Sequence, residues 1–121
     1  MTETTTFIHQ VMGNLRSNKI GEFTAEFEVE GKRRVLSGRF DSEIHPPLRA
    51  SRVTLHFERP DHLRGGFFID INGLHAVGPN NIRLSFIKPG FDPIRFLIDG
   101  PLDQILPRGI LVEGDGDWSN V

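Results

Sequence analysis

The sequence predicts an all-β, single-domain fold: an antiparallel β-sandwich or β-barrel of about eight or nine strands. The dominant hydrophobic period is two, in short runs separated by Gly, Pro, Asn and Asp. No window of about ten residues keeps the i, i+3, i+4, i+7 stripe of an amphipathic helix. The length of 121 residues suits one domain, 1–121, with one core. Sandwich and barrel need the same alternation, so the sequence leaves both open.

Residues 21–40, GEFTAEFEVEGKRRVLSGRF, form the most regular unit, a β-hairpin. A two-residue loop at Gly31-Lys32 would pair Phe27 with Leu36. One face then carries the apolar side chains and the other the charged ones. A slip of one residue would exchange core and solvent, so the faces are well specified.

The remaining elements follow from the same pattern. Residues 41–50, DSEIHPPLRA, are expected to form a loop, because the two prolines cannot donate ladder hydrogen bonds. A helical turn is expected only at residues 101–106, PLDQIL, and flexibility only at 1–5 and 114–121. The other expected strands are residues 6–11, RVTLHFE, GFFIDI, LHAV, NIRLSFI, PIRFLID and GILVE.

A second hairpin is predicted in FFIDINGLHAV. The dipeptide NG at residues 72–73 is a strong turn signal, and it would place Asp70 opposite His75 and Phe68 opposite Val77. The ribbon would then be apolar on both faces. Such a ribbon is either covered on both sides or packs against a partner chain.

The pair Asp70 and His75 is a candidate catalytic pair. A carboxylate across from an imidazole can orient the ring and raise its proton affinity, as a general base requires. In a barrel mouth the pair would serve an isomerase or a cyclase. The alternative, which we favour, is a structural cross-strand ion pair or hydrogen bond.

The third strand carries candidate metal ligands. His56 and Glu58 are two residues apart and point to one face, and His62, Asp61 or His45 would be a third ligand. Neither an HExxH motif nor any cysteine is present. We therefore favour a polar strand face, and expect no metal and no cofactor.

A ligand-binding possibility rests on arginines near the same strand, Arg49, Arg52, Arg59 and Arg64. If they gathered, they would bind a small anion. More often such arginines balance nearby acidic residues.

The C-terminal segment EGDGDWSNV has alternating acids at Glu113, Asp115 and Asp117. It lacks the full calcium-binding loop with its late bidentate glutamate, so we expect a flexible acidic tail, which Trp118 would dock against the body or against a neighbour. Nucleophilic catalysis has little support, because Ser37 lies within a strand and not in a GxSxG turn.

Composition excludes several function classes. The net charge is -2 and the only tight basic run is Lys32-Arg33-Arg34, so no nucleic acid partner is expected. No apolar run approaches the ~18 residues of a membrane span, and the sequence has no signal-peptide pattern, so we expect a cytoplasmic protein without membrane partners. Ten Phe, one Trp and no Tyr favour a core rather than a wet binding surface.

These observations favour a non-enzymatic module that acts by association with another protein or with itself. The two-sided apolar ribbon, the lack of catalytic motifs and the need to cover strand edges support this hypothesis. The alternative is a small barrel that binds an apolar small molecule inside, as an isomerase or cyclase that uses Asp70 and His75.

Overall fold

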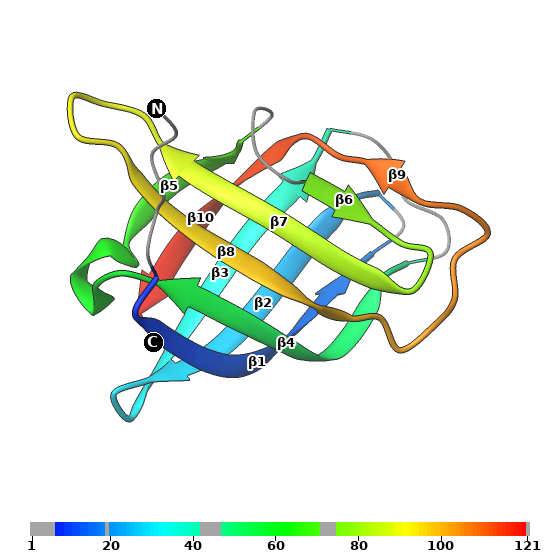
Figure 1. Cartoon of the computed structure of the whole chain (residues 1–121), viewed down its shortest axis with the longest axis horizontal. Helices are drawn as coiled ribbons and strands as arrows, with labels where there is room; N and C mark the ends of the chain where they lie inside the picture. The colour runs from blue at the N-terminus through cyan, green and yellow to red at the C-terminus, as the bar shows by residue number, and fades with distance from the viewer. Residues whose placement is uncertain (1–6, 19, 42–46, 71–74, 121) are drawn as a thin grey trace.

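A computed structural model describes residues 7–18, 20–41, 47–70 and 75–120 of the chain. Within these ranges one antiparallel sheet of ten strands closes into an eight-stranded barrel (Figure 1). The all-β prediction is confirmed, and the closed ring decides for a barrel. The elements are β1 His9–Ser17, β2 Glu22–Val29, β3 Lys32–Phe40, β4 Arg49–Phe57, the 3₁₀ turn η1 Pro60–His62, β5 Gly65–Ile69, β6 His75–Val77, β7 Asn81–Lys88, β8 Ile94–Pro101, β9 Ile110–Leu111 and β10 Gly114–Asn120.

The strand order around the barrel is β5-β10-β3-β2-β1-β4-β8-β7, and the pairing of β5 with β7 closes the ring. Strands β6 and β9 pair with each other at one end, where β6 also lies along the edge of β7 (Figure 1). β2 and β1 separate β3 from β4 in the sheet. The described residues form no helix that is long and apolar enough to span a membrane.

Aromatic side chains fill the barrel interior. The ring of Phe96 lies 4.7 Å from those of Phe67 and Phe86 and 5.2 Å from that of Trp118. Among the described residues, no polar or charged residue is buried. Burial of this apolar surface is the main driving force for closing the sheet.

The hairpin β2–β3 has the predicted faces but a different register. Glu30 and Gly31 form the turn with φ of 53° and 75°, as a type I′ turn requires. Phe27 therefore pairs with Arg34, and the predicted pair of Phe27 with Leu36 is wrong. The partner moves by two residues, so the same side chains stay inside. Those buried are Phe23, Ala25, Phe27, Val29, Leu36 and Phe40.

The second predicted hairpin is wrong, because β5 and β6 do not pair with each other. Phe68 of β5 lies between Asp115 of β10 and Ile87 of β7, so no edge remains for Val77. Val77 instead pairs with Ile82 on the inner face. Strands β5 and β6 run in the same direction along β7. The predicted turn at residues 72–73 lies outside the described residues.

The C-terminal segment is a strand and not the flexible tail that we expected. β10 pairs with β3 along its whole length and with β5 over Asp115–Trp118. Asp115 and Asp117 point outward, whereas Gly116 and Trp118 are buried. A Cβ at Gly116 would lie 3.1 Å from Leu36, so close packing explains the glycine. The expectation that Trp118 docks this segment is confirmed, since its ring is in the core.

The predicted helical turn at residues 101–106 is also wrong. Here Asp103 and Gln104 complete the edge of β4 beyond the end of its pairing with β8. The Ser51 NH donates to the Asp103 carboxylate at 3.0 Å, and the Arg49 NH donates to the Gln104 side-chain oxygen at 3.0 Å. These side chains, together with the Asp103 NH that donates to the Arg49 carbonyl at 2.8 Å, take the place of a neighbouring strand. The 3₁₀ turn lies at Pro60–His62 instead.

Candidate functional site

The outer face of β4 carries a carboxylate–imidazole pair, but not the one that the sequence predicted. His56 Nε2 lies 2.8 Å from Asp99 Oδ1 of β8. The two side chains are 19% and 34% exposed. Asp99 also borders a shallow depression on the outer wall, beside Asn80, Asn81 and Arg83.

This pair orients the imidazole without completing a catalytic site. No hydroxyl hydrogen-bonds the ring of His56 within the part of the chain that the structure describes. The pair lies diagonally across two strands, since His56 is opposite Leu97 and Asp99 is opposite Thr54. Such a pair contributes to sheet stability as an ordinary cross-strand contact.

The metal-site prediction receives no support from this geometry. Within the described ranges, no group of three or more His, Cys, Asp or Glu side chains is placed to hold a metal ion. His56 is occupied by Asp99, Glu58 is exposed beyond the end of β4, and His62 belongs to η1. Asp61 pairs with Arg59 at 3.0 Å. His45 lies outside the described residues.

The predicted hairpin pairing of Asp70 opposite His75 does not form. The Asp70 NH donates to the Ser85 carbonyl at 2.8 Å, whereas His75 pairs with Leu84. Asp70 and His75 therefore lie opposite two consecutive residues of β7 and not opposite each other. The Asp70 carboxylate lies 3.8 Å from the Arg95 guanidinium. The side chain of His75 lies outside the described part of the structure. The catalytic role of Asp70 and His75 stays a hypothesis.

The candidate anion-binding arginines do not gather. Arg49 and Arg52 lie in the first half of β4, whereas Arg59 and Arg64 follow its end. A strand of this length separates the two groups by roughly 25 Å. Arg49 and Arg52 lie close enough to Asp103 for their charges to help lower the pKa of its carboxyl. The prediction of one cluster of Arg49, Arg52 and Arg64 is therefore wrong.

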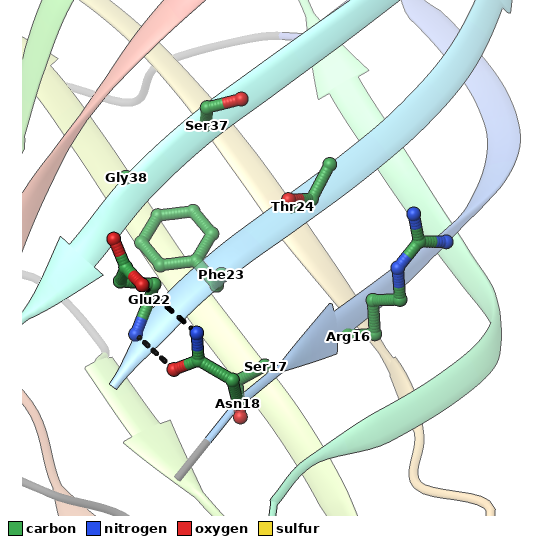
Figure 2. Close-up of a pocket in the computed structure, with 8 residues that line it drawn as sticks. All are labelled: Arg16, Ser17, Asn18, Glu22, Phe23, Thr24, Ser37 and Gly38. Carbon is green, nitrogen blue, oxygen red and sulfur yellow. Dashed lines mark hydrogen bonds between the residues drawn. The ribbon is translucent and has the colours of Figure 1, made fainter. Parts of the chain in front are cut away.

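A shallow polar pocket lies on the outside of β1, β2 and β3 (Figure 2). Asn18 and Glu22 hold its rim: the Asn18 amide donates to the Glu22 carboxylate at 2.9 Å, and the Glu22 NH donates back at 3.0 Å. The pKa of Glu22 is below its ordinary value, mainly through the hydrogen bond from Asn18, with Arg39 adding to the effect. Thr24 and Ser37 also border the pocket.

The outer wall of β5 and β7 carries an exposed aromatic side chain opposite a half-buried aliphatic one, Phe68 and Ile87. Phe68 is 56% exposed, whereas its neighbour Phe67 points inward and is 1% exposed. The predicted hairpin ribbon with two apolar faces is wrong, because β5 and β6 do not pair, but β5 itself has an apolar residue on each face, at Phe67 and Phe68. The register aligns four outer residues across four strands, Asp115, Phe68, Ile87 and Arg95, which we call the Phe68 row.

Beyond this row, Phe91 is fully exposed in the loop between β7 and β8. The sequence indicated the apolar outer face but could not show that Asp115 and Arg95 flank it. Comparison with protein-family models, curated proteins and solved structures found no match to this chain. Function must therefore be argued from the geometry alone.

Proposed function

We propose that this protein is a non-enzymatic β-barrel module that acts by association with another protein or with itself. The observation that carries the proposal is the apolar centre of the Phe68 row, in which Phe68 is exposed and Ile87 is half-buried. Phe68 and Ile87 lie directly opposite each other on the outer wall, where no strand of the described chain covers Phe68. A barrel needs apolar residues only inside, so an apolar pair outside favours a binding surface.

The packed interior favours this proposal over the ligand-binding alternative. The aromatic rings of Phe67, Phe86, Phe96 and Trp118 occupy the space that a small apolar molecule would need. Polar or charged side chains border each of the described pockets, and none of these pockets is lined by the four rings. An isomerase or cyclase reaction inside the barrel therefore has no supporting observation.

The expected association is modest. Full burial of a Phe side chain contributes about 1.5–3 kcal/mol, and Phe68 is already partly covered. A convex barrel wall also limits the contact area, and interfaces below about 1,200 Å² are usually transient. We expect association that depends on concentration, and a cytoplasmic location is part of the same proposal.

Sedimentation velocity with three proteins tests the proposal: wild type, Phe68→Ser and Met12→Ser. Met12 is an exposed apolar residue on β1, far around the wall, so it is a matched control. Over about 10 µM to 1 mM, the range of weak complexes, wild type and Met12→Ser should associate and Phe68→Ser should not.

A second arm covers partners other than the chain itself. Each protein is immobilised and exposed to a cell extract, and the retained proteins are compared. Loss of a retained protein with Phe68→Ser but not with Met12→Ser supports the proposal. If wild type stays monomeric, and immobilised Phe68→Ser and Met12→Ser retain the same proteins as immobilised wild type, the proposal is wrong.

A further inference from the structure

The Phe68 row has a charge order that its neighbours on the wall do not share. Asp115 of β10 is opposite Phe68, Phe68 is opposite Ile87, and Ile87 is opposite Arg95 of β8. Residues directly opposite each other on antiparallel strands share a face, and neighbouring strands are about 4.8 Å apart. The row therefore spans roughly 14 Å, with an acid at one end, a base at the other and an apolar centre.

This order is complementary to itself under one kind of two-fold rotation. If the axis runs parallel to β5 and β7, a second copy places its Asp115 over Arg95 and its Phe68 over Ile87. The same rotation places the second Arg95 over the first Asp115. If the axis instead runs along the row, Asp115 faces Asp115 and Arg95 faces Arg95, which is unfavourable.

We infer that the partner at this surface is a second copy of the chain, bound in an isologous dimer whose two-fold axis is parallel to β5 and β7. This inference rests on the proposed function and specifies its partner. Charge complementarity selects the occupant, because the row supplies both members of each ion pair. Two ion pairs then flank a centre of two Phe68 and two Ile87 side chains.

The electrostatic environment of the two charged residues suits this role. Arg95 lies 3.8 Å from Asp70, which orients its guanidinium on the outer wall. A guanidinium has five donors, so it can bind a second carboxylate as well. On the side away from Phe68, Asp115 is opposite Arg39 of β3. The Arg39 guanidinium lies 3.5 Å from the Glu22 carboxylate. The Asp115 carboxylate is exposed at the edge of the apolar centre.

Charge reversal at the two ends of the row provides the test. Asp115→Arg alone places Arg against Arg in both contacts of the homodimer, and Arg95→Glu alone places Glu against Asp. Each variant should raise the dimer dissociation constant about tenfold or more. In an equimolar mixture both contacts become attractive. The arginine introduced in the first variant meets the glutamate introduced in the second, and the native Arg95 of the first meets the native Asp115 of the second.

The measurement is fluorescence-detected sedimentation, with one variant labelled and the other titrated, in low and in high salt. Restoration of the heterodimer to within about threefold of the wild-type affinity, weakened by salt, supports the inference. Arg95→Glu also loses its contact with Asp70, so thermal unfolding is recorded for every variant. Asp115→Asn and Arg95→Gln, which only remove a charge, should weaken the dimer by a smaller factor.

Three results would overturn the inference. If both reversals weaken association and the mixture does not restore it, the two-fold geometry is wrong. If neither reversal changes the dissociation constant while Phe68→Ser still abolishes self-association, the charge-paired geometry is wrong and the proposed function stands. If wild type does not self-associate, the second copy is not the partner, and the extract experiment alone decides the proposed function.

Discussion

Two parts of the barrel wall have the same interior and different exteriors. Along β1, β2 and β3 the outer side chains form ion pairs, with Arg33 at 2.7 Å and Arg16 at 3.8 Å from Glu26. Along β5 and β7 the outer side chains include Phe68 and Ile87. Both parts bury apolar residues inside, and β1 also exposes Met12 on the outside. Of the two parts, however, only β5 and β7 place two apolar outer side chains directly opposite each other. This difference is the basis of our proposal that the wall of β5 and β7 makes contacts outside the monomer.

The largest expected effect contrasts the two adjacent phenylalanines of β5. Phe67→Ala should lower the free energy of unfolding by about 3–5 kcal/mol, because it opens a cavity against Phe96. Phe68→Ala, on the same strand, should change it by less than about 1 kcal/mol in the monomer. Urea denaturation at low protein concentration measures both. A larger loss for Phe68→Ala than for Phe67→Ala would contradict the assignment of inner and outer faces.

The next effect probes the close packing of β3. A Cβ at Gly38 would lie 2.0 Å from the Asp115 carbonyl oxygen, so Gly38→Ala must displace backbone and should cost about 1–3 kcal/mol. At Gly90 no atom lies within 4 Å of the added Cβ, which makes Gly90→Ala the control. Thermal unfolding compares the two variants. Equal unfolding temperatures would show that β10 does not lie against β3 as described.

A smaller effect depends on pH and concerns the edge of β4. The side chain and the NH of Ser51 donate to Asp103, and this lowers the pKa of the carboxyl below its ordinary value of 3.8. The lowered pKa contributes stability above about pH 3.8, and that contribution is lost as the pH falls through the folded-state value.

Ser51→Ala should therefore lower the unfolding temperature near neutral pH, and the deficit should shrink as the pH falls below 3.8. Unfolding scans at a series of pH values test this, with Ser119→Ala as the control for loss of a serine hydroxyl on the outer wall. A deficit that is independent of pH would mean that Asp103 is not the partner.

The smallest effect concerns the ion pairs of the polar wall. Glu26→Gln removes the charge that Arg33 and Arg16 share, and exposed pairs of this kind contribute about 0.2–1 kcal/mol. The loss should decrease in high salt, which screens exposed charges. Denaturation in low and high salt provides the measurement. A loss above about 2 kcal/mol would show that this wall, too, depends on specific contacts.

The sequence predicted the fold class because the alternation of inward and outward side chains can be identified within a single strand. In β2 the alternation of apolar and charged residues identified the buried face, and a register shift of two residues did not alter it. The turn at Glu30-Gly31 was missed because a non-glycine residue takes positive φ there. β10 was missed because Gly116 fills an inward position without a hydrophobic signal.

The candidate site depended on which distant strands pair with each other, and the alternation of side chains along a strand does not determine this. His56 and Asp99 are 43 residues apart in the chain, and only the pairing of β4 with β8 brings them together. The exposed Phe68 was indicated by the two-sided apolar pattern. Its flanking charges, Asp115 and Arg95, come from strands that the sequence could not place beside β5 and β7.

The most direct test of the contrast between the two walls is a concentration series of amide NMR spectra. On dilution from about 1 mM to 50 µM, a weak complex dissociates and only interface amides change their chemical shifts. The account predicts shift changes at Phe68, Ile87, Arg95 and Asp115, and none at Thr24 or Ser37 beside the pocket of Figure 2. Changes confined to β1, β2 and β3 would contradict it.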